Sequence, residues 1–400
     1  MGSVEHKIRK HALLSASGSS RWLNCTPSAR LEEKFEEPPA SKFAEEGTLA
    51  HEFGEIGLRK AINLMTATQY KKEAAKLKKN SLFAPEMLDY VEEYVNYVME
   101  SYSERDAKGE DPIMIIEEEV DFSDYVEEGF GTNDSMIIAD GTLEVIDLKY
   151  GKGIKVEAEE NSQLMLYGLG ALLKYELTYD IHTVKLTIVQ PRLKSISSWE
   201  ISAEDLLTWG EKEVRPKAEL AFEGAGVQKA GFWCKWCKAK AECATLASVN
   251  IKLAKGDFTD KKGEQKSPHL LTDKQLLEVY AKIPLLVEWA KAVSQHMLDT
   301  AKEGKEWKGY KLVEGRSNRK WLDEKKVIKT LKDELYDEAD FMTPPKLGGI
   351  GVVEKLLGKK DFTKFLGDLV VKPEGAPTLV EVSDKRPALG TEQAKEDFKE

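Results

Sequence analysis

The sequence has only four cysteines in 400 residues, too few for a small secreted fold held together by disulfides. No apolar run approaches the roughly 18 residues that a membrane-spanning helix needs, and we see no apolar segment of a secretory signal peptide. Positive charge is not in excess either, because 59 Lys and Arg face 70 Asp and Glu, a net charge of −11. We therefore expect a cytoplasmic protein without membrane contact and without a global basic field that attracts nucleic acid.

The length and the uneven charge favour more than one domain. Residues 251–400 carry 29 basic and 27 acidic residues, so the first 250 residues carry the acidity, a net −13. Residues 251–268 are rich in Lys, Gly and Asp and have the composition of a linker. We predict a first domain over 1–250, a smaller, mainly helical accessory domain over 269–375 and a polar tail over 376–400.

Hydrophobic spacing predicts an α/β protein with a mixed central sheet flanked by helices. After a short helical lead over 11–35, apolar residues recur at helical spacing over 45–64, 87–102, 159–174, 203–222 and 271–302. β-branched segments broken by Gly, Asp and Pro predict strands over 114–125, 131–153 and 183–193. Residues 71–80, which contain five lysines, are expected to form a basic loop.

Asp140-Gly141 lies between two apolar segments and is a strong signal for a two-residue hairpin turn. With such a turn, Ile138 faces Leu143, Met136 faces Val145 and Asp134 faces Asp147. Because side chains alternate along a strand, Lys149 is expected on the face that carries Asp147.

Two opposed aspartates repel each other, and a hard divalent cation is the obvious group to offset that repulsion. A lysine beside them could stabilise an anion or orient a water molecule, which points to metal-dependent phosphodiester hydrolysis. The alternative is an ordinary solvated sheet edge. In the same way His51, one helical turn before Glu55, is either a metal ligand or part of an exposed helix pair.

Three of the cysteines lie within ten residues, Cys234, Cys237 and Cys243, whereas Cys25 is near the start of the chain. They can be buried free thiols, zinc ligands or ligands of a [4Fe–4S] cluster. Zinc sites usually show paired cysteine knuckles, so the spacing favours the cluster over zinc. Nearby Phe232, Trp233 and Trp236 would shield a cluster from water or pack in the core.

Six elements, in this order along the chain, resemble the RecB-like branch of the PD-(D/E)XK (restriction-endonuclease-like) nucleases. Gly131-Thr132-Asn133-Asp134 with Asp147-Leu148-Lys149 resembles its catalytic core, Gly47-x-x-x-His51 its histidine motif and Gln163-x-x-x-Tyr167 its following helix. Cys25 with Cys234, Cys237 and Cys243 resembles its iron–sulfur members, among them AddB-type and CRISPR-adaptation nucleases. The layout is similar to phage and prophage proteins long catalogued without function.

The resemblance implies a DNA nuclease dependent on Mg²⁺ or Mn²⁺, with an exonuclease preference, acting in phage recombination or replication inside a bacterial host. It implies metal ligation by His51, Asp134, Asp147 and the Leu148 carbonyl, with Lys149 acting on water or phosphate. Glu119 is a weaker candidate ligand, and Glu117 is expected to share its face. Gln163 and Tyr167 would face the site and contact Lys149 or the DNA backbone.

Two other classes of protein fit the sequence. The chain could be a DNA-binding protein on a nuclease fold without catalysis, although Asp134, Asp147 and Lys149 are all present. It could also be a recruitment protein whose C-terminal part docks a single-strand annealing or replication protein. The sequence leaves oligomeric state, cleavage polarity and strand preference open.

Overall fold

The computed structural model describes residues 12–255 apart from Pro38, and then 273–315, 319–343, 346–347, 349–371, 377–381 and 388. The chain forms two compact units, residues 1–289 and 290–400. Most of the predicted linker at 251–268, and most of the predicted polar tail, lie outside the described residues, so both stay predictions.

The first unit is built on a mixed five-stranded sheet with the strand order β1-β2-β3-β4-β5. Strands β3 and β4 are parallel, with helix α6 between them in the chain, and every other pair of neighbours is antiparallel. The strands are β1 (Ile113–Asp121), β2 (Phe130–Ala139), β3 (Gly141–Leu148), β4 (Ile181–Gln190) and β5 (Ser195–Ser202). The expected mixed sheet flanked by helices is therefore confirmed.

The hairpin between β2 and β3 has the predicted register. Met136 pairs with Val145 and Ile138 with Leu143, and Gly141 has a φ of 79°, which suits glycine at the turn. The side chains of these four paired residues all belong to one hydrophobic core. Alternation along two strands and a recognisable turn were enough to predict this part of the sheet.

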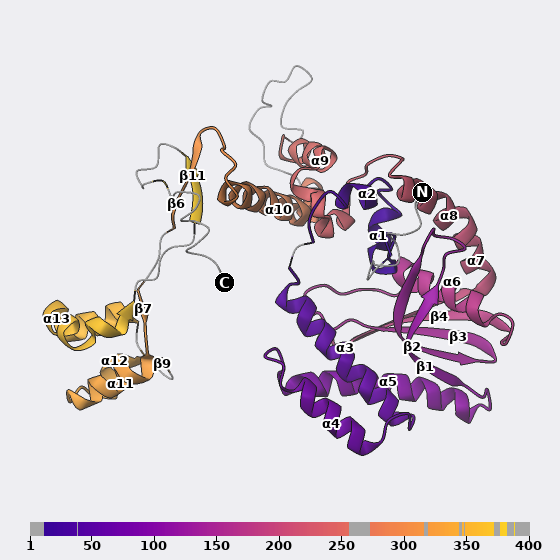
Figure 1. The fold of residues 1–400 in the computed structure, drawn as a ribbon, viewed down its shortest axis with the longest axis horizontal. Helices are drawn as coiled ribbons and strands as arrows, with labels where there is room; N and C mark the ends of the chain where they lie inside the picture. Colours follow the sequence, from indigo (N-terminus) through magenta and orange to yellow (C-terminus); the bar gives the residue numbers. More distant parts are fainter. Residues whose placement is uncertain are drawn as a thin grey trace. The chain divides into compact units, whose positions relative to one another are not determined.

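Helices cover both faces of the sheet (Figure 1). Helix α6 packs across β1 to β4 on one face, and α3 and α5 contact the other face through β1 and β2. The apolar residues of each face form a separate core. The helices are α3 (Lys42–Ala61), α4 (Ala67–Leu77), α5 (Glu86–Ala107), α6 (Ser162–Tyr175), α7 (Ala203–Trp209) and α8 (Arg215–Glu223), with a π-helical turn η4 (Gly210–Val214) between the last two.

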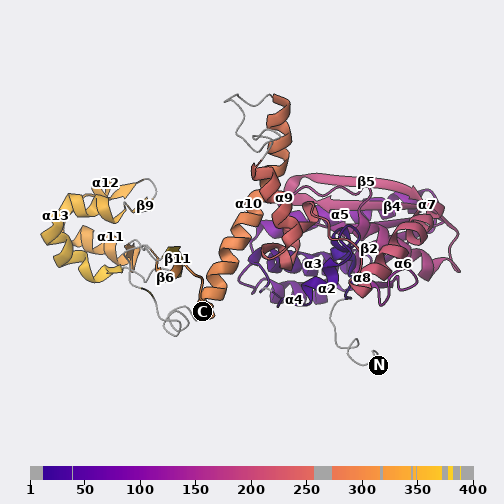
Figure 2. The ribbon, with the colours of Figure 1, turned by 90° about the horizontal axis from the view of Figure 1, so that it is seen from above.

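The expectation of a basic loop over 71–80 is wrong for most of that segment, because α4 extends to Leu77. Thr66 caps this helix, and Gln69 completes the capping box. Tyr70, Ala74 and Leu77 lie at helical spacing and pack against the neighbouring core, so the lysines occupy the outer face. A further strand, β5, was not predicted; it lies at an edge of the sheet (Figure 2). Its residues alternate in burial.

The helical lead consists of η2 (Ala16–Gly18), α1 (Ser19–Trp22) and α2 (Ser28–Glu32). It binds the cysteine segment, which contains η5 (Phe232–Trp236) and η6 (Lys238–Ala241) and is followed by α9 (Ala244–Lys255). One oxygen of Glu32 accepts a hydrogen bond from Arg21 at 2.7 Å, and the other accepts one from the Lys238 amide at 2.8 Å. Thr26 donates to the Ala225 carbonyl at 2.7 Å. The bonds of Glu32 with Lys238 and of Thr26 with Ala225 join two segments about two hundred residues apart.

The second unit has its own hydrophobic core, and its helices α11, α12 and α13 gather around it (Figure 2). Arg319 pairs with Glu354, and Trp321 packs against the same core. No helix among the described residues is long and apolar enough to cross a membrane. The remaining elements are α10 (Asp273–Lys302), which crosses the division between the units, then β6 (Tyr310–Glu314), β7 (Lys320–Trp321), α11 (Glu324–Asp333), α12 (Glu338–Phe341), β8 (Met342–Thr343), β9 (Lys346–Leu347), α13 (Ile350–Leu366), η7 (Gly367–Leu369), β10 (Val370–Val371) and β11 (Pro377–Glu381), with η3 (Pro191–Leu193) in the first unit.

Candidate functional site

Helix α3 and strand β2 place His51 beside Asp134. His51 Nδ1 lies 3.0 Å from Asp134 Oδ1, and both side chains are partly exposed. The second oxygen of Asp134 accepts a hydrogen bond from the Leu148 amide at 2.6 Å. The carboxylate is thus oriented from two sides, by the helix and by the end of β3.

Glu117 reaches the same place because the backbone of β1 is irregular at this residue. The register of β1 and β2 passes from Ile116–Ser135 to Glu118–Asn133 without a shift, so neither Glu117 nor Asp134 is paired in the ladder, and Glu117 has a φ of 52°. A positive φ interrupts the regular alternation of side chains along a strand. One ligand atom each from His51, Glu117 and Asp134 lie within 4.8 Å of one another, a spacing that suits a bound metal ion.

Asp147, Lys149, Gln163 and Tyr167 form a hydrogen-bonded network next to that group. Lys149 Nζ lies 3.0 Å from Asp147 Oδ2 and donates to Gln163 Oε1 at 2.9 Å. The Gln163 amide donates to Asp147 Oδ1 at 3.2 Å and to the Tyr167 hydroxyl at 3.3 Å. Gln163 is in the first turn of α6, which Asn161 caps, so the start of this helix is oriented toward the end of β3.

The two aspartates therefore have different partners. Asp134 binds His51 and Asp147 binds Lys149, so a cationic or ionisable group offsets the charge of each carboxylate. The described β2–β3 ladder ends one pair earlier, at Ser135 and Ile146. The predicted pairing of Asp134 with Asp147 therefore lies just beyond the ladder. The two residues are in the same site, but their side chains bind different partners.

Ionisation at this site is shifted in the direction expected of buried, crowded acids. Burial and the charge of Asp134 raise the pKa of Glu117 to about 7. Burial also raises the pKa of Asp147, although Lys149 opposes the rise. For His51, burial lowers the pKa, but the charge of Asp134 and its hydrogen bond outweigh burial and raise it to about 9. A cation at the centre of these groups would stabilise their charged carboxylates.

Tyr150 and Arg192 connect the end of β3 to α3. Tyr150 is buried in the core that α3 and α5 form, and the guanidinium of Arg192 lies 4.7 Å from the centre of its ring. Arg192 also pairs with Glu46 on α3 at 3.0 Å. The residue that follows Lys149 is thus held against the helix that carries His51.

The structure does not bring Glu119 to the group. Its side chain is exposed, and its backbone carbonyl accepts a hydrogen bond from Lys174. The expectation that Glu117 and Glu119 share a face is wrong, because the positive φ of Glu117 breaks the alternation, and Ile116 and Val120 pack in the cores of opposite faces. Arg192 was missed altogether; the only signal is its position just after a strand that is parallel to β3.

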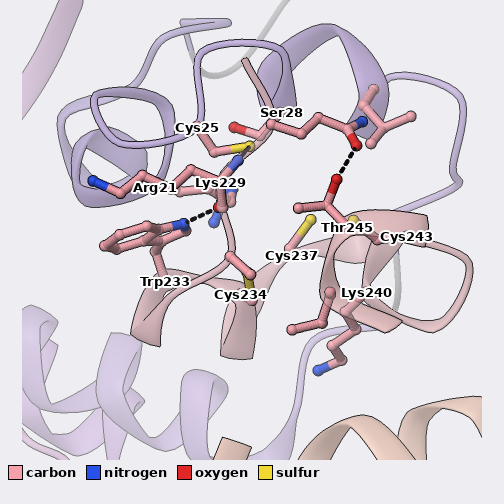
Figure 3. Close-up of a pocket in the computed structure, with 14 residues that line it drawn as sticks. Arg21, Cys25, Ser28, Lys229, Trp233, Cys234, Cys237, Lys240, Cys243 and Thr245 are labelled. Carbon is pink, nitrogen blue, oxygen red and sulfur yellow. Dashed lines mark hydrogen bonds between the residues drawn. The ribbon is translucent and has the colours of Figure 1, made fainter. Parts of the chain in front are cut away.

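All four cysteines line one pocket of the first unit (Figure 3). Cys25 comes from the lead, and the Lys229 amide donates a hydrogen bond to its sulfur at 3.5 Å. Burial raises the pKa of Cys234, and it raises that of Cys237 to about 12, so these thiolates need a positive partner to be stable. Trp233 lines the pocket, whereas Phe232 and Trp236 lie outside its wall.

These features define a mixed α/β protein with a histidine–carboxylate group at the end of its sheet and a four-cysteine pocket. The chain belongs to the family described as "Protein of unknown function (DUF2800)", which matches residues 11–387 and so covers both units. Among solved structures, one titled "Crystal structure of SSO0001" is similar over 55% of this chain and 95% of its own, at 16% identity and a TM-score of 0.20.

Proposed function

We propose that the protein is a metal-dependent DNA nuclease with a PD-(D/E)XK core. One observation carries the proposal: a metal-suited group of His51, Glu117 and Asp134 adjoins an Asp147–Lys149 pair at the end of one sheet. Phosphodiester hydrolysis needs a cation bound by carboxylates and, beside it, a positive group for the developing charge. Apart from Glu117, the residues that meet both requirements are ones that the sequence resemblance also selects.

His51, Glu117, Asp134 and Asp147 would hold the ion, with the Leu148 carbonyl as a further ligand. Carboxylate oxygens suit Mg²⁺ and Mn²⁺, and a neutral imidazole among them favours Mn²⁺. When bound, the ion activates water and neutralises charge on the phosphate. The protein's own contribution is to position these ligands: the Leu148 amide orients Asp134, and the irregular backbone at Glu117, with its positive φ, orients that side chain.

Lys149 would stabilise the negative charge that develops on the scissile phosphate, or orient the attacking water. Its ammonium is held by Asp147 and by the carbonyl oxygen of Gln163, so it needs little reorganisation when the substrate arrives. Gln163 is oriented in turn by Tyr167. This chain of contacts gives Gln163 and Tyr167 a positioning role. From the same location they would also contact the DNA backbone.

The four-cysteine pocket would hold a [4Fe–4S] cluster rather than zinc. The fit rests on four thiols that converge on one pocket and on buried thiols whose raised pKa values disfavour thiolates without a cation. The cluster would have a structural role, because Cys25 belongs to the lead and the other three to the segment after α8. It would reinforce the hydrogen bonds by which Glu32 and Thr26 already hold the lead to that segment.

Replacement of Cys237 by alanine tests the cluster. The protein purified without oxygen should be brown, and Cys237→Ala should lose the colour and melt at a lower temperature. Ser28→Ala changes another residue that lines the pocket and should keep the visible spectrum. An unchanged spectrum in Cys237→Ala would reject a cluster without affecting the proposed hydrolysis.

The exonuclease preference and the role in phage recombination or replication come from the family resemblance. The alternative is a DNA-binding or recruitment protein. The observation behind it is that residues 290–400 form a second unit with its own core, which would be the part that docks a partner. A partner lost on removal of that unit while cleavage is retained would support recruitment by the second unit.

The decisive experiment incubates end-labelled duplex, end-labelled single strand and closed circular DNA with Mg²⁺ or Mn²⁺, beside Asp147→Ala. Loss of label from linear DNA only, absent in the mutant, would establish an end-dependent nuclease and its polarity. Cutting of the circle would instead make the protein an endonuclease. No cleavage by the wild-type protein, or activity that survives excess EDTA, would overturn the proposed mechanism.

A further inference from the structure

Two large aromatic rings of the cysteine segment are exposed side by side. Phe232 is 60% exposed and Trp236 is 52% exposed, at the two ends of the short helix η5. Their ring centres lie 5.1 Å apart and the planes meet at 81°, so each ring packs its edge or face against the other. Exposed aromatic area of this kind on a protein surface usually marks a binding site.

The cysteine pocket does not account for this pair. In the same helix Trp233 lies against the pocket, and its ring NH donates to the Lys229 carbonyl at 2.9 Å. Trp233 therefore covers the cysteine pocket, whereas Phe232 and Trp236 do not line it.

The charge around the pair is positive in a domain that is otherwise acidic. Between Gly224 and Ala241 there are four lysines and no acidic residue. Lys238 pairs with Glu37, and Lys240 donates to the Lys235 carbonyl. Within the part of the chain that the structure describes, Lys229 and Lys235 form no ion pair. The Lys235 ammonium lies 5.6 Å from the centre of the Trp236 ring, whereas the Lys229 ammonium lies 5.7 Å from the centre of the Trp233 ring.

We propose that Phe232 and Trp236 form a stacking surface for the bases of single-stranded nucleic acid, with Lys235 as its phosphate contact. Stacking on aromatic rings next to a positive groove is how proteins hold single strands without reading sequence. A duplex fits poorly, because its bases are already stacked on one another. The inference rests on the proposed nuclease function only for the identity of the strand as substrate; binding itself needs no cleavage.

Binding is measured by fluorescence anisotropy in EDTA, which prevents cleavage, using a labelled oligo-dT of about 12 nucleotides, within the usual range of such sites. A strand of the same length without bases is measured beside it. We expect the wild-type protein to bind oligo-dT at least about fivefold more tightly than the abasic strand, since each stacked base contributes that much or more.

Substitutions separate stacking from general hydrophobicity. Trp236→Phe keeps a ring and should bind oligo-dT within about twofold of wild type, whereas Trp236→Leu keeps apolar area but should weaken binding at least about fivefold. Leu177→Ala, which alters a 96% exposed side chain elsewhere in the same unit, is the matched control and should change nothing. An unchanged circular dichroism spectrum shows that each variant is folded. Phe232→Ala removes the other ring and should weaken binding to the same extent, so it keeps the test valid if Trp236→Leu does not fold.

Equal affinity of Trp236→Leu and wild type, or equal binding of dT and abasic strands, would overturn the stacking surface. The cleavage assay on the same proteins reports separately on the proposed function. If linear DNA is cleaved but Trp236→Leu binds as tightly as wild type, the nuclease proposal stands and the stacking surface is rejected. If Trp236→Leu weakens binding but no DNA is cleaved, the stacking surface stands and the nuclease proposal is rejected.

Discussion

His51 on α3 hydrogen-bonds Asp134 on β2, with 3.0 Å between Nδ1 and Oδ1 and 83 positions between the residues in the chain. The contact fixes α3 against the end of the sheet and gives Asp134 one partner on each side, since the Leu148 amide binds its other oxygen. Because the pKa of His51 is raised to about 9, its ring carries a proton on each nitrogen at neutral pH, so a metal bound by this imidazole would have to displace a proton.

Glu117 and Glu119 provide a matched pair of substitutions. We expect Glu117→Gln to weaken Mn²⁺ binding at least about tenfold, because it removes a carboxylate from the group, and Glu119→Gln to leave binding unchanged. Titration calorimetry or the electron paramagnetic resonance of Mn²⁺ measures both. Equal affinities of the two variants would show that the Glu117 carboxylate does not bind the metal.

Gly131 lets the ring of Tyr167 approach β2. A Cβ at this position would lie 2.9 Å from Tyr167 Cε1, closer than side chains tolerate, so Gly131→Ala must displace the ring. We expect a loss of about 1–3 kcal/mol in the free energy of unfolding, typical of overpacking, and slower cleavage because Gln163 loses its orientation. Gly153→Ala, where a Cβ meets nothing within 4 Å, should show neither effect in chemical denaturation or in the nuclease assay.

The parts of the site that could be predicted are those encoded by local patterns. The hairpin around Asp140-Gly141 set the register, and period-two alternation then placed Lys149 with Asp147. The helical spacing of Gln163 and Tyr167 put both on one side of α6. Each of these relations depends on residues that are near in the chain or joined by one turn.

The parts that were missed depend on backbone irregularity or on distance. A glutamate with positive φ carries no sequence signal, so the irregular backbone at Glu117 and the resulting loss of Glu119 from the site could not be foreseen. Arg192 and Glu46 are 146 positions apart, and only the packing of α3 against the sheet brings them together. Helix α4 was also missed. It has few apolar residues among many lysines, so its composition indicated a loop although its apolar residues lie at helical spacing.

Arg192 is expected to be a positioning residue. Replacing it with Met removes the ion pair with Glu46 and the cation above the Tyr150 ring, two contacts worth about 1–2 kcal/mol together. We expect faster amide hydrogen exchange at 149–151 and slower cleavage at saturating metal. Lys155→Met, which removes an exposed ion pair with Glu157, should alter neither quantity. Unchanged exchange in the Arg192 variant would show that Tyr150 is held by its apolar contacts alone.

Glu144 should make the stability of the first unit depend on pH. It is fully buried, lies 3.0 Å from Lys185 and accepts hydrogen bonds from Ser101 and Thr187. Burial alone would raise its pKa, but Lys185 and these hydroxyl donors outweigh burial, and the pKa is lower than the ordinary 4.5. Since the folded pKa is below the unfolded one, the ionised group stabilises the fold above about pH 4.5, and this contribution is lost as the pH falls through the folded pKa.

We therefore expect Glu144→Gln to lower the free energy of unfolding at pH 7 by roughly 3 kcal/mol, because Lys185 keeps a charge without its buried partner. The decline in stability between pH 5 and pH 3 should be shallower in the variant than in wild type, since the variant has no proton to take up there. Urea denaturation across that range measures both effects. Glu200→Gln, which alters an exposed carboxylate at the position opposite Lys185 on β5, is the control and should follow the wild-type curve. Parallel curves for Glu144→Gln and wild type would mean that Glu144 does not titrate in this range.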